Sequence, residues 1–244
     1  MRKLLALYTL TLLAMTLFSG CAEQAVAPEV KDTEKTVGEL AENEADDAEE
    51  ADVDETEDVE EEATEETETE PFDQLAEPVA GDKVAVIETD LGTIKVKLFT
   101  DKIPGMTKNF EELAKSGTYN NVPFHRVAKD FMIQTGDFTN QDGTGGYSYN
   151  GPNTVLPDEI SPDLKHLYGT VSMANRGPNT NGSQFFIVTN KNGTAMLNGG
   201  YTVFGQVYEG MDVAEKIADL QKPGTEVPSE LVNMVSVEVM ELEG

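Results

Sequence analysis

The feature that most constrains this chain is a long acidic stretch that contains almost nothing to bury. Residues 22–80 hold 25 of the 46 acidic residues and only two lysines, which gives them a formal net charge of −23. Such a stretch cannot offset the entropy lost on ordering, because its side chains are polar and repel one another. We therefore expect residues 21–78 to be a disordered acidic linker, and residues 79–244 to be the one folded domain.

Three roles for this linker are open: a spacer, a solubilising brush, or a weak binder of cations. A spacer is favoured, because calcium and magnesium sites need carboxylates held in a fixed geometry. About 57 flexible residues have an r.m.s. reach of roughly 40 Å, and charge repulsion extends them further. The linker is thus long enough to hold a domain clear of a membrane surface.

The first twenty residues have the pattern of a secretory signal. Arg2 and Lys3 precede an uncharged apolar run of about fifteen residues, which is shorter than the roughly twenty residues of a membrane span. The segment LFSGC that follows resembles the lipobox of bacterial lipoproteins, although Phe18 stands where an aliphatic residue is usual. Cys21 is the only cysteine. We expect residues 1–20 to be a lipoprotein signal peptide and Cys21 to be lipidated, with an uncleaved N-terminal anchor as the alternative.

Charge and composition also limit the location and the partners. Export and lipidation predict a cell-membrane protein on the extracytoplasmic face, and the long spacer favours a Gram-positive surface over a Gram-negative periplasm. Residues 81–244 carry a net charge of −8 and no basic stripe, which disfavours nucleic acid. Two histidines and a single cysteine predict no metal site and no cofactor. Without a second cysteine, the folded part has no disulfide and relies on its core.

From Gly81 onward the apolar pattern becomes that of short strands joined by turns. Ile94, Val96 and Leu98 alternate with lysines, as in a half-buried strand, and the turn 90–92 joins this strand to an apolar run before it. Further strands are predicted at 124–127, 131–135, 170–174, 184–189, 202–208 and 234–242, and helices at 104–117 and 211–220. This count predicts a mainly β fold, a closed eight-stranded antiparallel barrel with two capping α-helices, with a β-sandwich as the alternative.

Three separated segments interleave cationic, amide and apolar side chains. They are FHRVAKDFMIQTGDFT at 124–139, MANRGPNTNGSQFFI at 173–187 and MLNGGYTVFGQV at 196–207. Together they resemble the cyclophilin-type peptidyl-prolyl cis-trans isomerases, and the resemblance extends over residues 84–242. It implies a cyclophilin-like barrel, in agreement with the strand and helix count, and rotamase activity in protein folding.

The resemblance also assigns roles to individual residues. The arginine of the family falls on Arg126, and the polar groups that hold the peptide backbone fall on Gln134 and Asn175, which makes these three the candidate catalytic residues. The candidate substrate-binding residues are His125, Phe131, Met132, Ala174, Phe186, Met196, Leu197 and Tyr201. Residues 180–182 match the loop that borders a second pocket in the family.

The chemistry of prolyl isomerisation suits this set of residues. Rotation about an amide meets a barrier of about 18–20 kcal/mol, and prolyl bonds populate both isomers. A catalyst needs no nucleophile and no metal, but must bind the twisted amide better than the planar forms. The nitrogen of a twisted prolyl amide regains a lone pair, to which Arg126 can donate a hydrogen bond. An apolar pocket fixes the proline ring meanwhile.

Each residue also has a structural interpretation. Phe186, taken singly, is more typical of a core, and Arg126 is compatible with a surface ion pair to Asp130 or Asp137. His125 is expected to be structural, because the reaction transfers no proton. The combination of all these residues in one mixed pattern favours the site.

Several positions depart from the family pattern. Met196 replaces a tryptophan that contributes to cyclosporin binding in many relatives, so we expect weak inhibition by cyclosporin. Tyr201 replaces a histidine of the pocket, and Arg176 replaces a small residue. Residues 146–161 form an unusual insert. These departures leave substrate preference open and weaken catalysis little.

The leading hypothesis is a membrane-tethered monomer that isomerises proline-containing segments of exported proteins and so assists their folding. The rival is a non-catalytic scaffold or chaperone module that binds proline-containing peptides. Arg126 disfavours this rival, because a pure binder needs the pocket but no charge aimed at the prolyl nitrogen. A third hypothesis makes the acidic linker itself the functional part.

Overall fold

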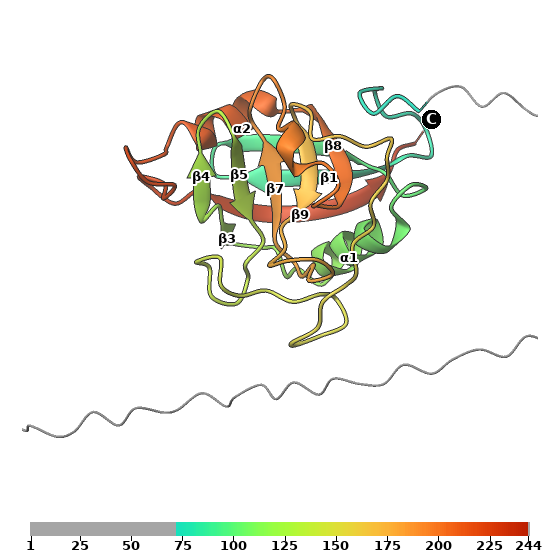
Figure 1. Cartoon of the computed structure of the whole chain (residues 1–244), viewed down its shortest axis with the longest axis horizontal. Coiled ribbons are helices and arrows are strands. Elements are labelled where there is room, and N and C mark those ends of the chain that lie inside the picture. The colour runs from blue at the N-terminus through green and yellow to red at the C-terminus, as the bar shows by residue number, and fades with distance from the viewer. Residues whose placement is uncertain (1–71, 244) are drawn as a thin grey trace, which may run out of the picture. The chain divides into compact units, whose positions relative to one another are not determined.

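Residues 72–243 are the part of the chain that the computed structural model describes (Figure 1). The predicted signal peptide, Cys21 and most of the predicted linker lie outside these residues. Within the described part no helix is long and apolar enough to cross a membrane. The elements are β1 (Lys83–Thr89), β2 (Gly92–Leu98), α1 (Pro104–Lys115), β3 (Val122–Pro123), β4 (Arg126–Ala128), β5 (Met132–Thr135), β6 (Thr170–Met173), β7 (Phe185–Val188), the 3-10 helix η1 (Ala195–Leu197), β8 (Val203–Glu209), α2 (Met211–Ala218) and β9 (Asn233–Glu241).

The nine strands of the described part form one antiparallel sheet that curls around the core. Its strand order is β3-β9-β1-β2-β8-β6-β7-β5-β4. β1 and β2 form the predicted hairpin, in which Thr89 pairs with Gly92 across the turn. α1 and α2 lie at opposite ends of the curled sheet (Figure 1). The predicted mainly β, antiparallel fold with two helices is confirmed.

The sheet has one strand more than predicted, because one segment contributes two strands. The sequence predicted a single strand at 124–127. The chain instead pairs first with β9, through β3, and then with β5, through β4. These two are the end strands of the sheet, and only Phe124 and His125 separate them in the chain. No ladder of hydrogen bonds joins these two end strands within residues 72–243; continuous backbone joins them, so the predicted barrel closes through the chain rather than through a strand pair.

The interior of the curled sheet is filled by aromatic side chains and by the inner face of α1. Met106 and Phe110, four residues apart on the helix, are both buried there. The Phe110 ring lies 5.2 Å from the ring of Tyr119, 5.4 Å from that of Phe185 and 5.3 Å from that of Phe204, between ring centroids. Burying a side chain such as Phe contributes about 1.5–3 kcal/mol. This cluster therefore ties α1 to β7 and β8.

The insert at 146–161 stabilises the start of α1. The Glu159 carboxylate accepts hydrogen bonds from the main-chain N–H of Gly105 (3.0 Å) and of Met106 (2.7 Å). The first N–H groups of a helix have no partner within the helix, and a negative charge there is favourable. The insert that departs from the family pattern thus caps a helix.

Within residues 72–78, which composition assigns to the linker, Gln74 and Phe72 contact the domain. The Gln74 side chain is 6% exposed. It donates to the carbonyl of Lys165 at 2.8 Å and accepts from the N–H of the same residue at 2.9 Å. The Phe72 ring meets the Phe99 ring edge-on at 5.5 Å. Composition misses this contact, because a short polar segment docks here mainly through hydrogen bonds rather than through an apolar pattern.

Candidate active site

β5 and β7 place alternate side chains on opposite faces of the sheet. Along β7, Phe185 and Ile187 belong to the interior core, whereas Phe186 and Val188 pack in a separate apolar cluster. Met132 of β5 belongs to that second cluster. Because successive residues of a strand point to opposite faces, this cluster lies on the outer face of the sheet. The candidate site is therefore on the outside of the barrel wall.

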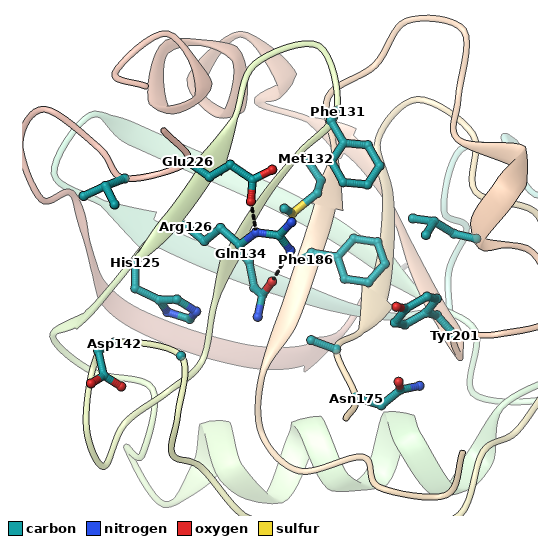
Figure 2. A pocket seen from close by; sticks show the side chains of 14 residues that line it. His125, Arg126, Phe131, Met132, Gln134, Asp142, Asn175, Phe186, Tyr201 and Glu226 are labelled. Atoms are coloured by element: carbon teal, nitrogen blue, oxygen red, sulfur yellow. Dashed lines mark hydrogen bonds and ion pairs between the residues drawn. The ribbon is translucent and has the colours of Figure 1, made fainter. Parts of the chain in front are cut away.

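Three neighbouring strands bring a cation, an amide and an aromatic ring into one row. Arg126 of β4 is opposite Gln134 of β5, which in turn is opposite Phe186 of β7. Side chains directly opposed on one face lie about 4.5–5.5 Å apart at Cβ. The Arg126 Nη1 donates a hydrogen bond of 3.1 Å to Gln134 Oε1 (Figure 2). The register of the sheet thus assembles residues from two of the three predicted segments.

A cavity of about 510 Å³ opens over this row. Of the site residues predicted in the folded domain, all but Met196 line it. Met196 lies in η1 and is 86% exposed, whereas its neighbour Leu197 packs on the outer apolar cluster. The predicted residues that line the cavity are His125, Arg126, Phe131, Met132, Gln134, Ala174, Asn175, Phe186, Leu197 and Tyr201. Asp142, Gly143, Glu226 and Val227 complete the lining.

Two side chains hold the Arg126 guanidinium at the edge of the cavity. Its Nε donates to Glu226 Oε2 at 2.6 Å, in an ion pair, and its Nη1 donates to Gln134. The partner is Glu226, not the Asp130 or Asp137 of the surface-pair alternative. The Gln134 amide is itself fixed, because its Nε2 donates to Gln184 Oε1 at 2.9 Å. Gln134 therefore orients Arg126, in addition to lining the cavity.

The apolar floor of the cavity is supported from behind by a buried histidine. The His166 ring stacks on the Phe186 ring at 5.8 Å between centroids and 11° between planes. Its Nδ1 lies 2.9 Å from Asn198 Oδ1 and its Nε2 lies 3.0 Å from Ser172 Oγ. The Tyr201 ring meets Phe186 edge-on at 5.7 Å. These contacts fix the aromatic ring that forms the floor.

A glycine-rich loop, residues 139–145, forms the wall beside His125. Asp137 holds this loop in shape through hydrogen bonds. The Asp137 carboxylate is buried and accepts five main-chain hydrogen bonds. The donors are the N–H groups of Thr139, Asn140, Asp142, Gly143 and Gly145. Burial raises the pKa of Asp137, but these donors outweigh burial and hold the pKa well below its ordinary value. The negative charge is therefore kept, and with it the shape of the loop.

His125 lies against this loop with both ring nitrogens buried. Neither nitrogen has a hydrogen-bond partner among residues 72–243. A Cβ at Gly143 would come within 3.1 Å of the ring, and the φ of +92° at this position favours glycine. Burial lowers the pKa of His125 below its ordinary value, more strongly than the Asp137 and Asp142 charges raise it. A neutral, enclosed ring fits the expected structural role.

The opposite wall offers main-chain groups to a ligand. The Asn175 Nδ2 donates to the carbonyl of Gly200 at 3.0 Å, and its Oδ1 accepts from the N–H of Gly177 at 3.3 Å. Within the described part, the main-chain N–H and C=O of Asn175 have no partner. Figure 2 shows Asn175 and Tyr201 on the far side of the cavity from Arg126. Asn175 therefore keeps one main-chain donor and one main-chain acceptor that the described part of the fold does not use.

The predicted second pocket is present as a smaller cavity of about 70 Å³. Thr180 and Gly182 line it, but Asn181 does not. The Asn181 side chain is buried, and its Nδ2 donates to Asp158 Oδ1 at 2.7 Å. Arg176 also lines this cavity and donates to the carbonyls of the glycine-rich loop.

Sequence reasoning missed the acidic and loop residues of the main cavity. Asp142 and Gly143 lie in the loop that follows the segment 124–139, where no periodic pattern distinguishes them. Glu226 and Val227 come from the loop between α2 and β9, far from the three segments. The signal that was available for Glu226 was the positive charge of Arg126, which requires a nearby acid once it is partly buried.

An outer-face cavity with an apolar floor, one held cation and free main-chain groups defines a site for an extended peptide. The model of the family described as "Cyclophilin type peptidyl-prolyl cis-trans isomerase/CLD" matches residues 84–239. The chain therefore belongs to the cyclophilin-type peptidyl-prolyl cis-trans isomerases. The predictions of this family and of isomerase activity are confirmed.

Relatives and solved structures agree with this family. The chain is 43% identical over 157 residues to peptidyl-prolyl cis-trans isomerase-like 1 of Aspergillus fumigatus, covering 64% of this chain and 94% of that protein. It is 43% identical over 159 residues to peptidyl-prolyl cis-trans isomerase 9 of Schizosaccharomyces pombe, covering 65% of this chain but only 25% of that protein. A cyclophilin-type isomerase of Cryptosporidium parvum superposes with a TM-score of 0.61 at 35% identity, covering 66% and 99% of the two chains. The same parasite protein was also solved in the presence of the dipeptide Ala-Pro, with a TM-score of 0.60.

Proposed function

We propose that this chain catalyses prolyl cis-trans isomerisation in the 510 Å³ cavity, on proline-containing segments of exported proteins, while held at the membrane through a lipidated Cys21. The observation that carries the catalytic part is the row formed by Arg126, Gln134 and Phe186. It places fixed donors beside an apolar floor. A proline ring on that floor has its nitrogen within reach of the guanidinium.

The contacts assign a separate role to each part of the cavity. The ring packs on Phe186 and Met132, with Phe131 and Leu197 beside them in the same outer cluster. The free main-chain groups of Asn175 hold the peptide backbone on one side of the prolyl bond. When rotation is restricted to that one bond, Arg126 stabilises the pyramidal nitrogen of the twisted amide, which is the species that catalysis must favour.

The cellular part of the proposal rests on the sequence. The signal-like residues 1–20, the lipobox-like LFSGC and the long acidic stretch support export, lipidation and a spacer between membrane and domain. Replacement of Cys21 by Ala tests the anchor: the protein should move from the membrane fraction to the soluble extracytoplasmic fraction. Mass spectrometry should find a diacylglyceryl-modified N-terminus in the wild type alone. A wild-type protein that is bound to the membrane but carries no lipid would contradict the proposed lipid anchor.

Exchange NMR on an Ala-Pro peptide tests the activity itself. At substoichiometric protein, the cis and trans resonances of the peptide should exchange faster than in its absence, because the cavity interconverts them. The competing function, a scaffold that only binds proline-containing segments, shifts the resonances without accelerating exchange. Binding without exchange would therefore replace the proposed enzyme by the scaffold.

A further inference from the structure

The loop between α2 and β9 covers the free edge of the strand that carries Arg126. β4 is an end strand of the sheet. The N–H of Val127 donates to the carbonyl of Glu226 at 2.8 Å, and the N–H of Lys129 donates to Gln221 Oε1 at 2.7 Å. An exposed strand edge carries unpaired main-chain groups, and these two bonds satisfy them. They also fix the backbone of Glu226 relative to β4.

The Glu226 side chain uses this fixed backbone to reach the guanidinium next to it. Its Oε2 lies 2.6 Å from Arg126 Nε, and Glu226 itself lines the cavity. Figure 2 shows the guanidinium between Glu226 and Gln134, with both contacts drawn as dashed lines. A charge-assisted hydrogen bond of this kind is short and directional. The two partners therefore hold the planar group at two points.

The donor count shows what is left for a substrate. An arginine side chain carries five N–H donors in a rigid fork. The Nε donor points to Glu226, and one Nη1 donor points to Gln134. Two Nη2 donors and one Nη1 donor remain. Because the fork is planar, fixing two of its donors fixes the direction of the other three.

We propose that Glu226 is a positioning residue of this site: it orients the Arg126 guanidinium so that the remaining donors face the prolyl nitrogen. This inference rests on the proposed isomerase function and deepens it. Glu226 acts through Arg126 and touches no reacting atom. A donor that is held before the substrate arrives loses no freedom in the transition state, so its loss should lower kcat more than peptide affinity.

The chain offers two informative variants and a matched control. Glu226→Ala removes both the acceptor and the charge, whereas Glu226→Gln keeps an oxygen that can accept from Nε. Glu230→Ala removes the same charge from the same loop; Glu230 is exposed and forms no ion pair within residues 72–243. We expect Glu226→Ala to lower kcat about tenfold, which corresponds to about 1.4 kcal/mol. Peptide Kd should stay within about twofold, Glu226→Gln should retain most of kcat, and Glu230→Ala should match the wild type.

Two further readouts separate orientation from a general structural effect. The ¹H–¹⁵N heteronuclear NOE of the Arg126 Nε should fall in Glu226→Ala, which reports a freed side chain, and persist in Glu226→Gln and Glu230→Ala. In an Arg126→Ala background, adding Glu226→Ala should cause no further loss of kcat, because residues that act through one another are not additive.

The inference is overturned if Glu226→Ala leaves either kcat or the Arg126 NOE unchanged. It is also overturned if Glu226→Ala causes its full loss in the Arg126→Ala background, since Glu226 would then act on the peptide directly. An inactive wild type refutes the proposed function instead, and an unchanged NOE in Glu226→Ala would still refute the orientation of Arg126.

Discussion

Arg126 is the residue on which the account of this site depends, and its surroundings decide how it acts. A guanidinium on a free surface strand samples many rotamers and is solvated by water. Here it is half-exposed and held by Gln134 and Glu226 at 3.1 and 2.6 Å. It keeps its charge and three donors, and it borders an apolar floor where electrostatic interactions are less screened than in water. The same residue type therefore becomes a directed donor.

His166 shows how a residue without contact to substrate supports the floor. Burial lowers the pKa of His166 below its ordinary value, and the hydrogen bond with Asn198 opposes this only in part. Asn198 Oδ1 also accepts the main-chain N–H of His166 and lies 2.9 Å from the Nδ1 atom of the ring. The neutral ring stacks on Phe186. Protonation would place a charge in this buried position.

The stability of the domain should therefore fall in mild acid. The folded-state pKa of His166 lies below the unfolded-state value of about 6.5. The unfolded chain thus binds a proton first as pH falls, so the contribution to stability is complete above pH of about 6.5 and declines below it. NMR titration of the ring protons should give pKa values below the ordinary one for both His166 and His125, with a lower Tm at pH 5.5 than at 7.5. A His166 pKa at or above its ordinary value would contradict this assignment.

At the scale of elements, the end of the predicted linker acts as part of the domain. Gln74 reaches the loop before β6 and also donates to Thr170 Oγ1 at 3.0 Å and to Gln206 Oε1 at 3.3 Å. These partners belong to β6 and β8, the central strands of the sheet. Residues 72–78 thus connect the acidic stretch to the middle of the fold rather than to a loose terminus.

Replacement of Gln74 by Ala should destabilise the domain. It removes four hydrogen bonds of a buried side chain, and each such bond contributes about 0.5–1.5 kcal/mol. For a domain of this size each kcal/mol corresponds to a Tm change of about 2–4 °C. Thermal unfolding followed by circular dichroism measures this change. Leu75→Ala is the matched control, because Leu75 is an exposed neighbour. Equal Tm values for Gln74→Ala and the wild type would show that the segment does not contribute.

Elements with a regular period were predictable from the sequence, and loops that dock through single polar groups were not. The alternation in 93–98 correctly predicted a strand, and the helical spacing of Met106 and Phe110 correctly predicted a helix. The family pattern placed Phe186 and Leu197 in the cavity. Met196 was placed there because it stands at the position of a family tryptophan, but it lies in the 3-10 helix η1 with its side chain exposed to solvent.

The missed residues share a physical cause. Glu226 contacts Arg126 across 100 positions of sequence, through a loop with no apolar period. Gln74 docks through its amide in a segment whose composition resembles the acidic stretch before it. The sequence predicted one strand at 124–127, whereas the chain forms β3 just before this range and β4 at its end, and the neighbour with which each strand pairs is a tertiary property. Local patterns carry no information on these contacts.

At the scale of the whole molecule, the position of the cavity matters most. It lies on the outer wall of the barrel, over strands β4, β5 and β7, and not inside the barrel. One proline-containing segment of a long polypeptide can therefore enter the cavity, and no part of the sheet needs to open. The site rests on regular strands, which hold side chains more precisely than loops do. This arrangement suits a catalyst that acts on unfolded segments of larger proteins.

The central claim is that this cavity accelerates prolyl isomerisation through the donor of Arg126. The most direct test measures kcat for an Ala-Pro peptide and the peptide Kd in the wild type and in Arg126→Ala. Removing one preorganised donor to a transition state typically costs a factor of about 10²–10³ in kcat. We expect a loss of about hundredfold in kcat, with a peptide Kd within about threefold, because the apolar floor and Asn175 remain. An unchanged kcat in Arg126→Ala would contradict the account.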